Sequence, residues 1–395
     1  MPEQQKESLW SPQFIGFSTS SCFFYMAQYI LISALPLIIT NSFGGTAFAA
    51  GMAMMYFQLG TVICRPFAGE LIDGVNKRVV LLVTTVLFLI VMIGFDFIHS
   101  LQMVYILRLL HGAIFAVGTT AVAAVAVLVL PKTRKGEGIG YFSVAVNIAM
   151  VIGPFLGLTV FQEWGTSATF MFLSIVALLA VIAANFKPLS KEMAAVPHRP
   201  KRPWNFDRIF ERKTIPWSVM GLFACFTYSG VLVFVPILMT SLGIGTMASW
   251  FFIAFALVIV VTRPWVGRAY DNLGPDYLIY PGYVVYIIGL VALAFSTSAL
   301  WIIVSGAVIG LGYGAIAPAF QTLGVQAAKP ERAGAATATY FWSLDIGVGL
   351  GSLLLSLAIE SLGFTGMYLL NAGVALVALV LYHFVIRPRY GIKAA

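Results

Sequence analysis

Long apolar stretches recur along the whole chain, and short segments rich in turn residues and charges separate them. Each stretch has about twenty residues or more, which is long enough to cross the roughly 30 Å hydrocarbon layer of a membrane as a helix. A helix is expected because a lipid-exposed backbone must satisfy its own hydrogen bonds. The pattern predicts an all-α membrane protein with twelve spans, at approximately 13–39, 46–70, 79–97, 101–130, 137–161, 167–186, 215–240, 247–269, 277–296, 298–327, 334–359 and 364–386.

The amino-acid composition supports a membrane protein and argues against ordinary soluble domains. Of the 395 residues, 60% are hydrophobic and 10% are charged, whereas soluble domains are about half apolar and about a quarter charged. The three cysteines, Cys22, Cys64 and Cys225, lie far apart in apolar stretches. Their spacing fits neither metal ligands nor a disulfide framework, so we expect no metal site and no cofactor.

The positive charges indicate how the spans are oriented. If both termini are cytoplasmic, all of the 23 Lys and Arg residues except Arg108 lie at the cytoplasmic face, and the outer connections carry Asp96, Glu163 and Glu360. This asymmetry follows the positive-inside rule and predicts a multi-pass protein of the cell membrane with cytoplasmic termini. The net charge of +8 therefore indicates contact with anionic membrane lipids, and nucleic acid is not an expected partner.

One long polar connection, at 187–213, divides the chain near its middle. We interpret it as a cytoplasmic linker between an N-terminal six-helix bundle, 1–186, and a C-terminal six-helix bundle, 214–395. Within it, residues 203–210 either form a short helix at the membrane interface or belong to a flexible basic linker. In the helical alternative, the side chains facing lipid would be Trp204, Phe206 and Phe210.

The two halves of the chain share landmarks at a constant spacing. Residues 65–73 and 263–271 both read R-P-x-x-G-x-x-x-D, and 263 − 65 gives an offset of 198. The same offset relates Asn147 to Asp345, and it also relates a glycine pair, Gly153 and Gly351. We therefore predict two pseudo-symmetric six-helix bundles, related by an axis along the membrane normal, that enclose a substrate pathway and rock against each other.

A local motif connects the second and third spans. Gly69, Asp73 and Arg78 fit the pattern G-x-L-a-D-R-x-G-R-K/R, but Gly74 replaces its first Arg and Asn76 its second Gly. Asn tolerates the left-handed turn that Gly usually supplies. With this motif the chain resembles the major facilitator superfamily, and more narrowly its drug:proton antiporter branch with twelve spans. The resemblance covers nearly the whole chain.

The resemblance implies that this motif latches one conformation of the transporter. In this sequence the missing Arg removes part of the charge relay, while Asp73 could still face the N-terminus of the eleventh helix. The alternative is a topological turn with no switching role. With the repeat, the residues expected to serve gating are Arg65, Gly69, Asp73, Arg78, Arg263, Gly267 and Asp271.

Two further motifs carry the resemblance. Arg108, followed by His111 and Gly112, is similar to the family's fourth-span pattern R-x-x-q-G, with His in place of Gln. A buried Arg in a membrane is functional by default because it is costly unless paired or hydrated; the alternative is that Arg108 snorkels to the outer interface. Part of the antiporter signature G-x-x-x-G-P-x-x-G-G marks close helix packing and a bending point at Gly153, Pro154 and Gly157.

Asp345 is the acid that lies well inside an apolar span, and its counterpart in the repeat is the uncharged Asn147. Removing a carboxylate from water favours its protonated form, as a proton carrier requires. We therefore expect Asp345 to couple transport to protons, with Arg108 as its electrostatic partner. The alternative is a structural carboxylate satisfied by neighbouring helices.

Polar and aromatic side chains within the spans are candidates to line a substrate cavity. The resemblance implies that the first, fourth, seventh and tenth spans face it, although helix–helix contact explains each of these residues about equally well. With Arg108 and Asp345, the expected substrate-binding set is Tyr25, Gln28, Tyr29, Gln58, Asn147, Tyr228, Tyr313, Gln321 and Trp342.

Three functions compete. The first is a proton-coupled exporter, an antiporter of small amphiphilic or zwitterionic molecules such as drugs or an amino-acid-derived metal chelator, acting as a monomer by alternating access. The second is a proton symporter that imports a sugar or an organic acid, because fold does not fix direction. The third, a membrane-embedded enzyme, is disfavoured because the histidines that could serve it are scattered.

Overall fold

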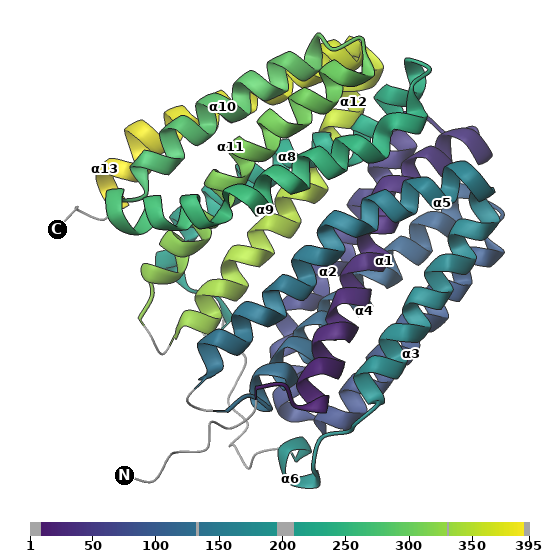
Figure 1. Cartoon of the computed structure of the whole chain (residues 1–395), viewed down its shortest axis with the longest axis vertical. Helices are drawn as coiled ribbons and strands as arrows, with labels where there is room; N and C mark the ends of the chain where they lie inside the picture. Colours follow the sequence, from purple (N-terminus) through teal and green to yellow (C-terminus); the bar gives the residue numbers. More distant parts are fainter. Residues whose placement is uncertain (1–8, 132–133, 196–208, 330–331, 391–395) are drawn as a thin grey trace.

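The computed structural model describes residues 9–131, 134–195, 209–329 and 332–390, and every regular element in those ranges is a helix (Figure 1). The helices are α1 (Pro12–Ser42), α2 (Ala47–Gly74), α3 (Lys77–Gly94), α4 (Leu101–Leu128), α5 (Lys135–Asn185), α6 (Lys191–Ala194), α8 (Ile215–Ser241), α9 (Ala248–Leu273), α10 (Asp276–Ala294), α11 (Ala299–Gln326), α12 (Ala333–Leu381) and α13 (Arg387–Tyr390). Trp204 and Phe206, in the segment expected to be an interfacial helix, lie outside the described residues.

Two of these helices turn back on themselves. Gly165 in α5 and Gly363 in α12 have φ angles of 79° and 67°, which cost an L-residue with a Cβ about 1–2 kcal/mol. The reversal of α5 is visible in hydrogen bonds with α1, where Ser33, Ser42 and Ser20 meet Pro154, Thr166 and Ala180 in turn. Ten helices of the described chain are long and apolar enough to cross a membrane, and the two reversals make twelve spans, as the hydrophobic pattern predicts.

The helices repeat at the offset found in the sequence. α4 and α11 each have 28 residues, begin at Leu101 and Ala299, and are capped by Ser100 and Ser298, whose hydroxyls accept from backbone N–H groups. The starts of α5 and α12 and the two reversing glycines also differ by 198 positions. The structure therefore confirms a two-fold repeat, and Figure 1 shows the halves as neighbouring bundles, one purple to teal and one green to yellow.

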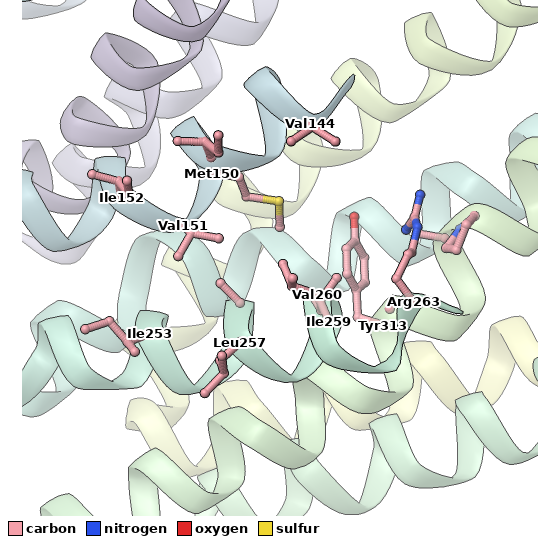
Figure 2. Close-up of a pocket in the computed structure, with 15 residues that line it drawn as sticks. Val144, Met150, Val151, Ile152, Ile253, Leu257, Ile259, Val260, Arg263 and Tyr313 are labelled. Carbon is pink, nitrogen blue, oxygen red and sulfur yellow. The ribbon is translucent and has the colours of Figure 1, made fainter. Parts of the chain in front are cut away.

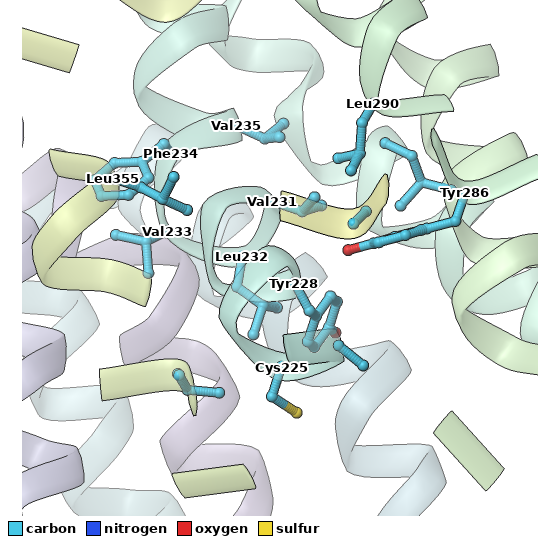
Figure 3. Close-up of a cluster of buried hydrophobic side chains, with 14 of the residues drawn as sticks. Cys225, Tyr228, Val231, Leu232, Val233, Phe234, Val235, Tyr286, Leu290 and Leu355 are labelled. Carbon is cyan, nitrogen blue, oxygen red and sulfur yellow. The ribbon is translucent and has the colours of Figure 1, made fainter. Parts of the chain in front are cut away.

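Each half has its own buried core. In the N-terminal half, α5 lies very close to α1, because a Cβ on Gly157 would stand 2.9 Å from the Cα of Ile30 and one on Gly153 would stand 2.6 Å from the Cβ of Tyr29. In the C-terminal half, α8 is the central helix: Figure 3 shows its side chains, such as Leu232 and Phe234, packed on several sides. The close packing expected of the two glycines is therefore present.

At one end of the bundle, α1 begins, α2 meets α3 and α12 ends; we call this the terminal end. We call the opposite end the far end. The halves meet at the far end: Gln162 donates to the Gly245 carbonyl oxygen at 2.7 Å, and Thr46 donates to Glu360 at 3.1 Å. Nearby, Gly51 lies against the backbone of Ser352. The halves also face each other along two seams, one between α2 and α12 and the other between α5 and α9. Contacts nearer the terminal end differ between these two seams.

Candidate functional site

A charged pair joins the halves between α2 and α12. Arg65 Nε donates to Asp345 Oδ2 at 2.5 Å, and the two side chains are 17% and 15% exposed. Thr61, one turn earlier on α2, lies beside the same carboxylate. Since the carboxylate belongs to one half and the guanidinium to the other, neutralising either removes an ion pair between the halves.

Aromatic and backbone contacts surround this pair. Trp342, three residues before Asp345 on α12, donates its indole N–H to the Val62 carbonyl oxygen at 3.0 Å. Its ring packs on Phe210, with 4.8 Å between centroids. The adjoining residue Glu211 accepts a hydrogen bond from Arg332 through its carboxylate, and its backbone N–H donates to the Thr339 hydroxyl oxygen at 2.9 Å. The end of the linker is thus tied to the start of α12 and, through Trp342, to α2.

Arg108 is not the partner of Asp345, contrary to the prediction. Its guanidinium lies inside the N-terminal half, where it donates to the Ala53 carbonyl oxygen at 3.3 Å and to Gln28 Oε1 at 3.1 Å. It also lies 3.2 Å from His111 Nδ1 and sits 4.4 Å from the centre of the Phe57 ring. Because Arg108 is only 1% exposed, snorkelling to the outer interface is also wrong.

The other seam, between α5 and α9, holds a cavity of about 550 Å³. Figure 2 shows its walls: Val144, Val151 and their neighbours come from α5, and Ile259 and Val260 come from α9. The remaining wall is α11, from Tyr313 to Pro318. Nearly all of the lining is apolar, with Arg263 and Tyr313 as its polar side chains. A cavity of this size and lining fits a small amphiphilic molecule.

An aromatic stack lies behind the cavity. Tyr228 of α8 stacks on Tyr313, with centroids 4.2 Å apart, and on Phe255 of α9, with centroids 5.4 Å apart. The Tyr313 hydroxyl lies 3.5 Å from Cys225 Sγ. The stack connects α8, α9 and α11, so a ligand in the cavity would touch side chains that hold the C-terminal half together.

The structure brings some predicted residues together and separates others. Asp345, Trp342, Arg65 and Gln58 meet at the α2–α12 seam, where Gln58 faces Gly349 and accepts from Thr61. Tyr25 packs on Phe115 and also lies near Arg65 and Asp345. Tyr29 packs on α5 and lies near Tyr228, which stacks on Tyr313. Gln28 bonds to Arg108, and Gln321 is half-buried on α11.

The predicted gating residues are also dispersed. Arg78 bonds to the Leu189 carbonyl oxygen within the N-terminal half, and Pro154 accepts from Ser33. Other gating positions, Gly69, Gly267 and Asp271, are exposed toward the terminal end. The side chains of Asp73 and Asn147 lie outside what the structure describes.

Sequence reasoning missed the pairing of Arg65 with Asp345 and the apolar cavity. The pairing had a signal, because Arg65 and Asp345 belong to the two landmark sets that share the offset of 198. The cavity had none, since side chains such as Val144 and Val260 look like lipid-facing residues. In the described residues no group of three His, Cys, Asp or Glu side chains is placed to hold a metal ion.

Comparison with protein families gives matches to one family model that together cover most of the chain. The family model described as Major Facilitator Superfamily matches residues 17–347 and, in a second match, residues 217–394. Among curated proteins, multidrug resistance protein MdtG of Klebsiella pneumoniae is 23% identical over 376 residues, covering 90% of this chain and 89% of that protein. The staphylopine export protein of Staphylococcus aureus is 23% identical over 382 residues, covering 92% and 94%.

Solved structures show the same fold. A peptide transporter POT in complex with sulfate superposes with a TM-score of 0.78 at 14% identity, covering 96% of this chain and 95% of that one. A bacterial homolog of the human lysosomal transporter Spinster superposes with a TM-score of 0.76 at 12% identity, covering 95% and 96%.

Proposed function

Because the chain belongs to the Major Facilitator Superfamily, a family of membrane transporters, we propose that it exports small amphiphilic molecules in exchange for protons. Membership of this family excludes the alternative of a membrane-embedded enzyme. The observation that carries the proposal is the Arg65–Asp345 pair, in which a carboxylate largely removed from water also bonds the two halves together. One protonation event there changes both the charge and the contact.

The proposed cycle follows from this geometry. When Asp345 is ionised, its bond to Arg65 holds the terminal end closed along α2 and α12. A proton that reaches Asp345 from the far side neutralises the carboxylate, and the halves can then part at the terminal end. There the proton leaves and a substrate enters, the pair forms again, and the substrate is released at the far side. Each cycle moves one proton inward and one substrate outward, because each ligand favours a different state.

The relatives support export over import. MdtG is named for multidrug resistance and the staphylopine export protein for export. The apolar cavity between α5 and α9 accommodates amphiphilic molecules, and an amino-acid-derived metal chelator remains a variant of the same proposal. A symporter that imports a sugar or an organic acid is less well supported, since sugars are recognised by polar side chains and this cavity offers few.

We further propose that the transporter works as a monomer in the cell membrane with both termini in the cytoplasm. The charged pair and the cavity each form within one chain. Exposed basic residues near the terminal end, among them Lys187, Lys191 and Arg389, would face anionic lipids of the inner leaflet. The terminal end is then the cytoplasmic end.

Labelling of an introduced cysteine tests this orientation. A cysteine that replaces the exposed residue Tyr277, at the start of α10, should react with impermeant maleimide only in everted vesicles.

Transport in everted membrane vesicles tests the proposed exchange. An imposed proton gradient, acid inside, should drive uptake of an amphiphilic test compound, and adding the compound should release protons. Three compounds serve: ethidium, dansyl-undecanoic acid and a zwitterionic amino-acid-derived chelator. Asp345→Asn should abolish proton release, whereas Glu163→Gln, at an exposed position, should keep it. Normal proton exchange in Asp345→Asn would refute the role of this carboxylate, and uptake driven by sodium alone would refute proton coupling.

A further inference from the structure

The cavity occupies the position in the repeat that the Arg65–Asp345 pair occupies in the other seam. Adding 198 to the α2 residues of that seam, or subtracting it from the α12 residues, gives the facing residues of α9 and α5. Thus Val62 corresponds to Val260, Arg65 to Arg263, Trp342 to Val144 and Asp345 to Asn147. Of these counterparts, Val260, Arg263 and Val144 line the cavity.

The two seams differ in chemistry at equivalent positions. The α2–α12 seam has polar side chains, Gln58 and Thr61, where the α5–α9 seam has Ala256 and Ile259. The large Trp342, which bonds across its seam, is replaced by Val144. Both seams keep the arginine, Arg65 in one and Arg263 in the other. The position equivalent to Asp345, however, is Asn147, which has an amide in place of a carboxylate. One seam is therefore closed by an internal ion pair, while the other has a cation, an apolar space and no internal anion in register.

Arg263 is exposed and has no side-chain partner in the described part of the chain. In the described residues, no hydrogen bond or ion pair is formed by its side chain. It lies ten residues before the end of α9 at Leu273, which corresponds to about 15 Å of helix. A cation at that depth of a span is costly unless it is paired or hydrated. It also borders a second cavity of about 240 Å³ that extends toward Asp271, so the guanidinium stands where the apolar space ends.

We propose that the α5–α9 cavity binds amphiphilic anions, with the anionic group of the ligand on Arg263 and its apolar body against α5, α9 and α11. This inference specifies the substrate class of the proposed exporter. The ligand supplies at Arg263 the negative charge that Asp345 supplies at Arg65. Tyr313, whose ring forms part of the wall, gives the ligand an aromatic face. The occupant is a transported carboxylate that enters from the terminal side of the seam.

Binding to the purified full-length chain in phosphatidylcholine nanodiscs tests this site without requiring transport. Fluorescence of dansyl-undecanoic acid measures its affinity, and its uncharged methyl ester is the matched ligand. We expect the acid to bind about tenfold more tightly than the ester, a difference of about 1.4 kcal/mol. Arg263→Gln should remove that preference, and Arg263→Lys should keep most of it. Arg268 is an exposed arginine of the same helix that lies outside the cavity. Arg268→Gln should therefore leave the preference for the acid unchanged.

Two more variants distinguish a specific loss of ligand binding at this site from unfolding of the protein. Val144→Trp places the bulky residue of the closed seam in the cavity and should weaken both acid and ester, while the apparent melting temperature stays near that of wild type. Asn147→Asp introduces a carboxylate at the register position of Asp345 and should remove the preference for the acid. Both should elute as monodisperse protein.

The proposal is overturned if acid and ester bind equally to wild type, or if Arg263→Gln keeps the preference for the acid. It is also overturned if replacing part of the phosphatidylcholine by phosphatidylglycerol displaces the acid from wild type, because the occupant would then be an anionic lipid. Since no proton gradient is present, binding that persists while proton exchange fails would contradict the exporter and leave this site standing.

Discussion

Two arginines inside the spans show how position decides what a buried charge does. Arg65 bonds across the halves to Asp345, whereas Arg108 is held within one half by Gln28, His111 and the Ala53 carbonyl oxygen. Sequence alone marks both as functional, Arg65 because it begins a repeated motif and Arg108 because it is a cation in an apolar span. It cannot tell them apart, since the partner of each is set by which helices pack together. Arg108 is therefore expected to stabilise the N-terminal half.

Substituting Arg108 tests that assignment. Arg108→Lys keeps the charge but cannot reach the Ala53 carbonyl oxygen and Gln28 Oε1 together while lying over the Phe57 ring. The loss of a charge-assisted hydrogen bond should cost about 1–3 kcal/mol. We expect a lower apparent melting temperature in detergent, measured by intrinsic fluorescence, with Arg268→Lys unchanged as the control. A melting temperature equal to that of wild type would show that Arg108 is not a structural anchor.

Glu211, outside the spans, makes stability at the terminal end depend on pH. The hydrogen bond from Arg332 lowers the pKa of the Glu211 carboxyl, and the Lys213 backbone N–H adds to this. A carboxyl with a lower pKa in the folded protein stabilises it above the ordinary value of about 4.3. That contribution disappears as the pH falls through the folded-state pKa.

Melting temperatures at two pH values test this. Glu211→Gln should melt below wild type at neutral pH, and the gap should narrow as the pH is lowered past about 4. Glu163→Gln, at an exposed position, is the control and should match wild type throughout. A gap that does not change with pH would mean that the ionised carboxylate is not what stabilises the contact.

Among the elements, the contact between α1 and α5 leaves little room for a side chain at Gly157. A methyl group on Gly157 would stand 2.9 Å from the backbone of Ile30, so Gly157→Ala must push the helices apart. Overpacking of this kind typically costs about 1–3 kcal/mol. Gly140→Ala, in the same helix with nothing within 4 Å, should be neutral or slightly stabilising because Ala favours helix. Equal melting temperatures for the two variants would contradict the close packing.

The sequence predicted the elements well for a physical reason. Spans are set by local properties, because the bilayer requires long apolar helices and the chain reverses where a residue such as Gly165 permits a positive φ. The predicted breaks at 161–167 and 359–364 contain both reversing glycines. The pairing across the halves was beyond this reasoning. Which face of α2 meets α12 depends on how the bundles pack, so the prediction assigned Asp345 the wrong arginine.

At the scale of the whole molecule, the two-fold repeat and the positions at which the halves differ explain the proposed exchange. The two-fold repeat places Arg65 and Arg263 in equivalent seams, yet only one seam contains a carboxylate in register with its arginine. A symmetric scaffold is thus used asymmetrically: the α2–α12 seam would respond to protons and the α5–α9 seam to substrate. Both act on the same motion of one half against the other, which is the condition for exchange.

Protonation of Asp345 is expected to open the terminal end by removing its ion pair with Arg65. Spin labels on cysteines replacing Val79 of α3 and Tyr277 of α10, both exposed near that end, report the separation of the halves by pulsed electron resonance. The native Cys22, Cys64 and Cys225 would be replaced first. Lowering the pH should shift wild type toward longer distances, and Asp345→Asn should show the longer distances at every pH. A pH response that persists unchanged in Asp345→Asn would contradict the account.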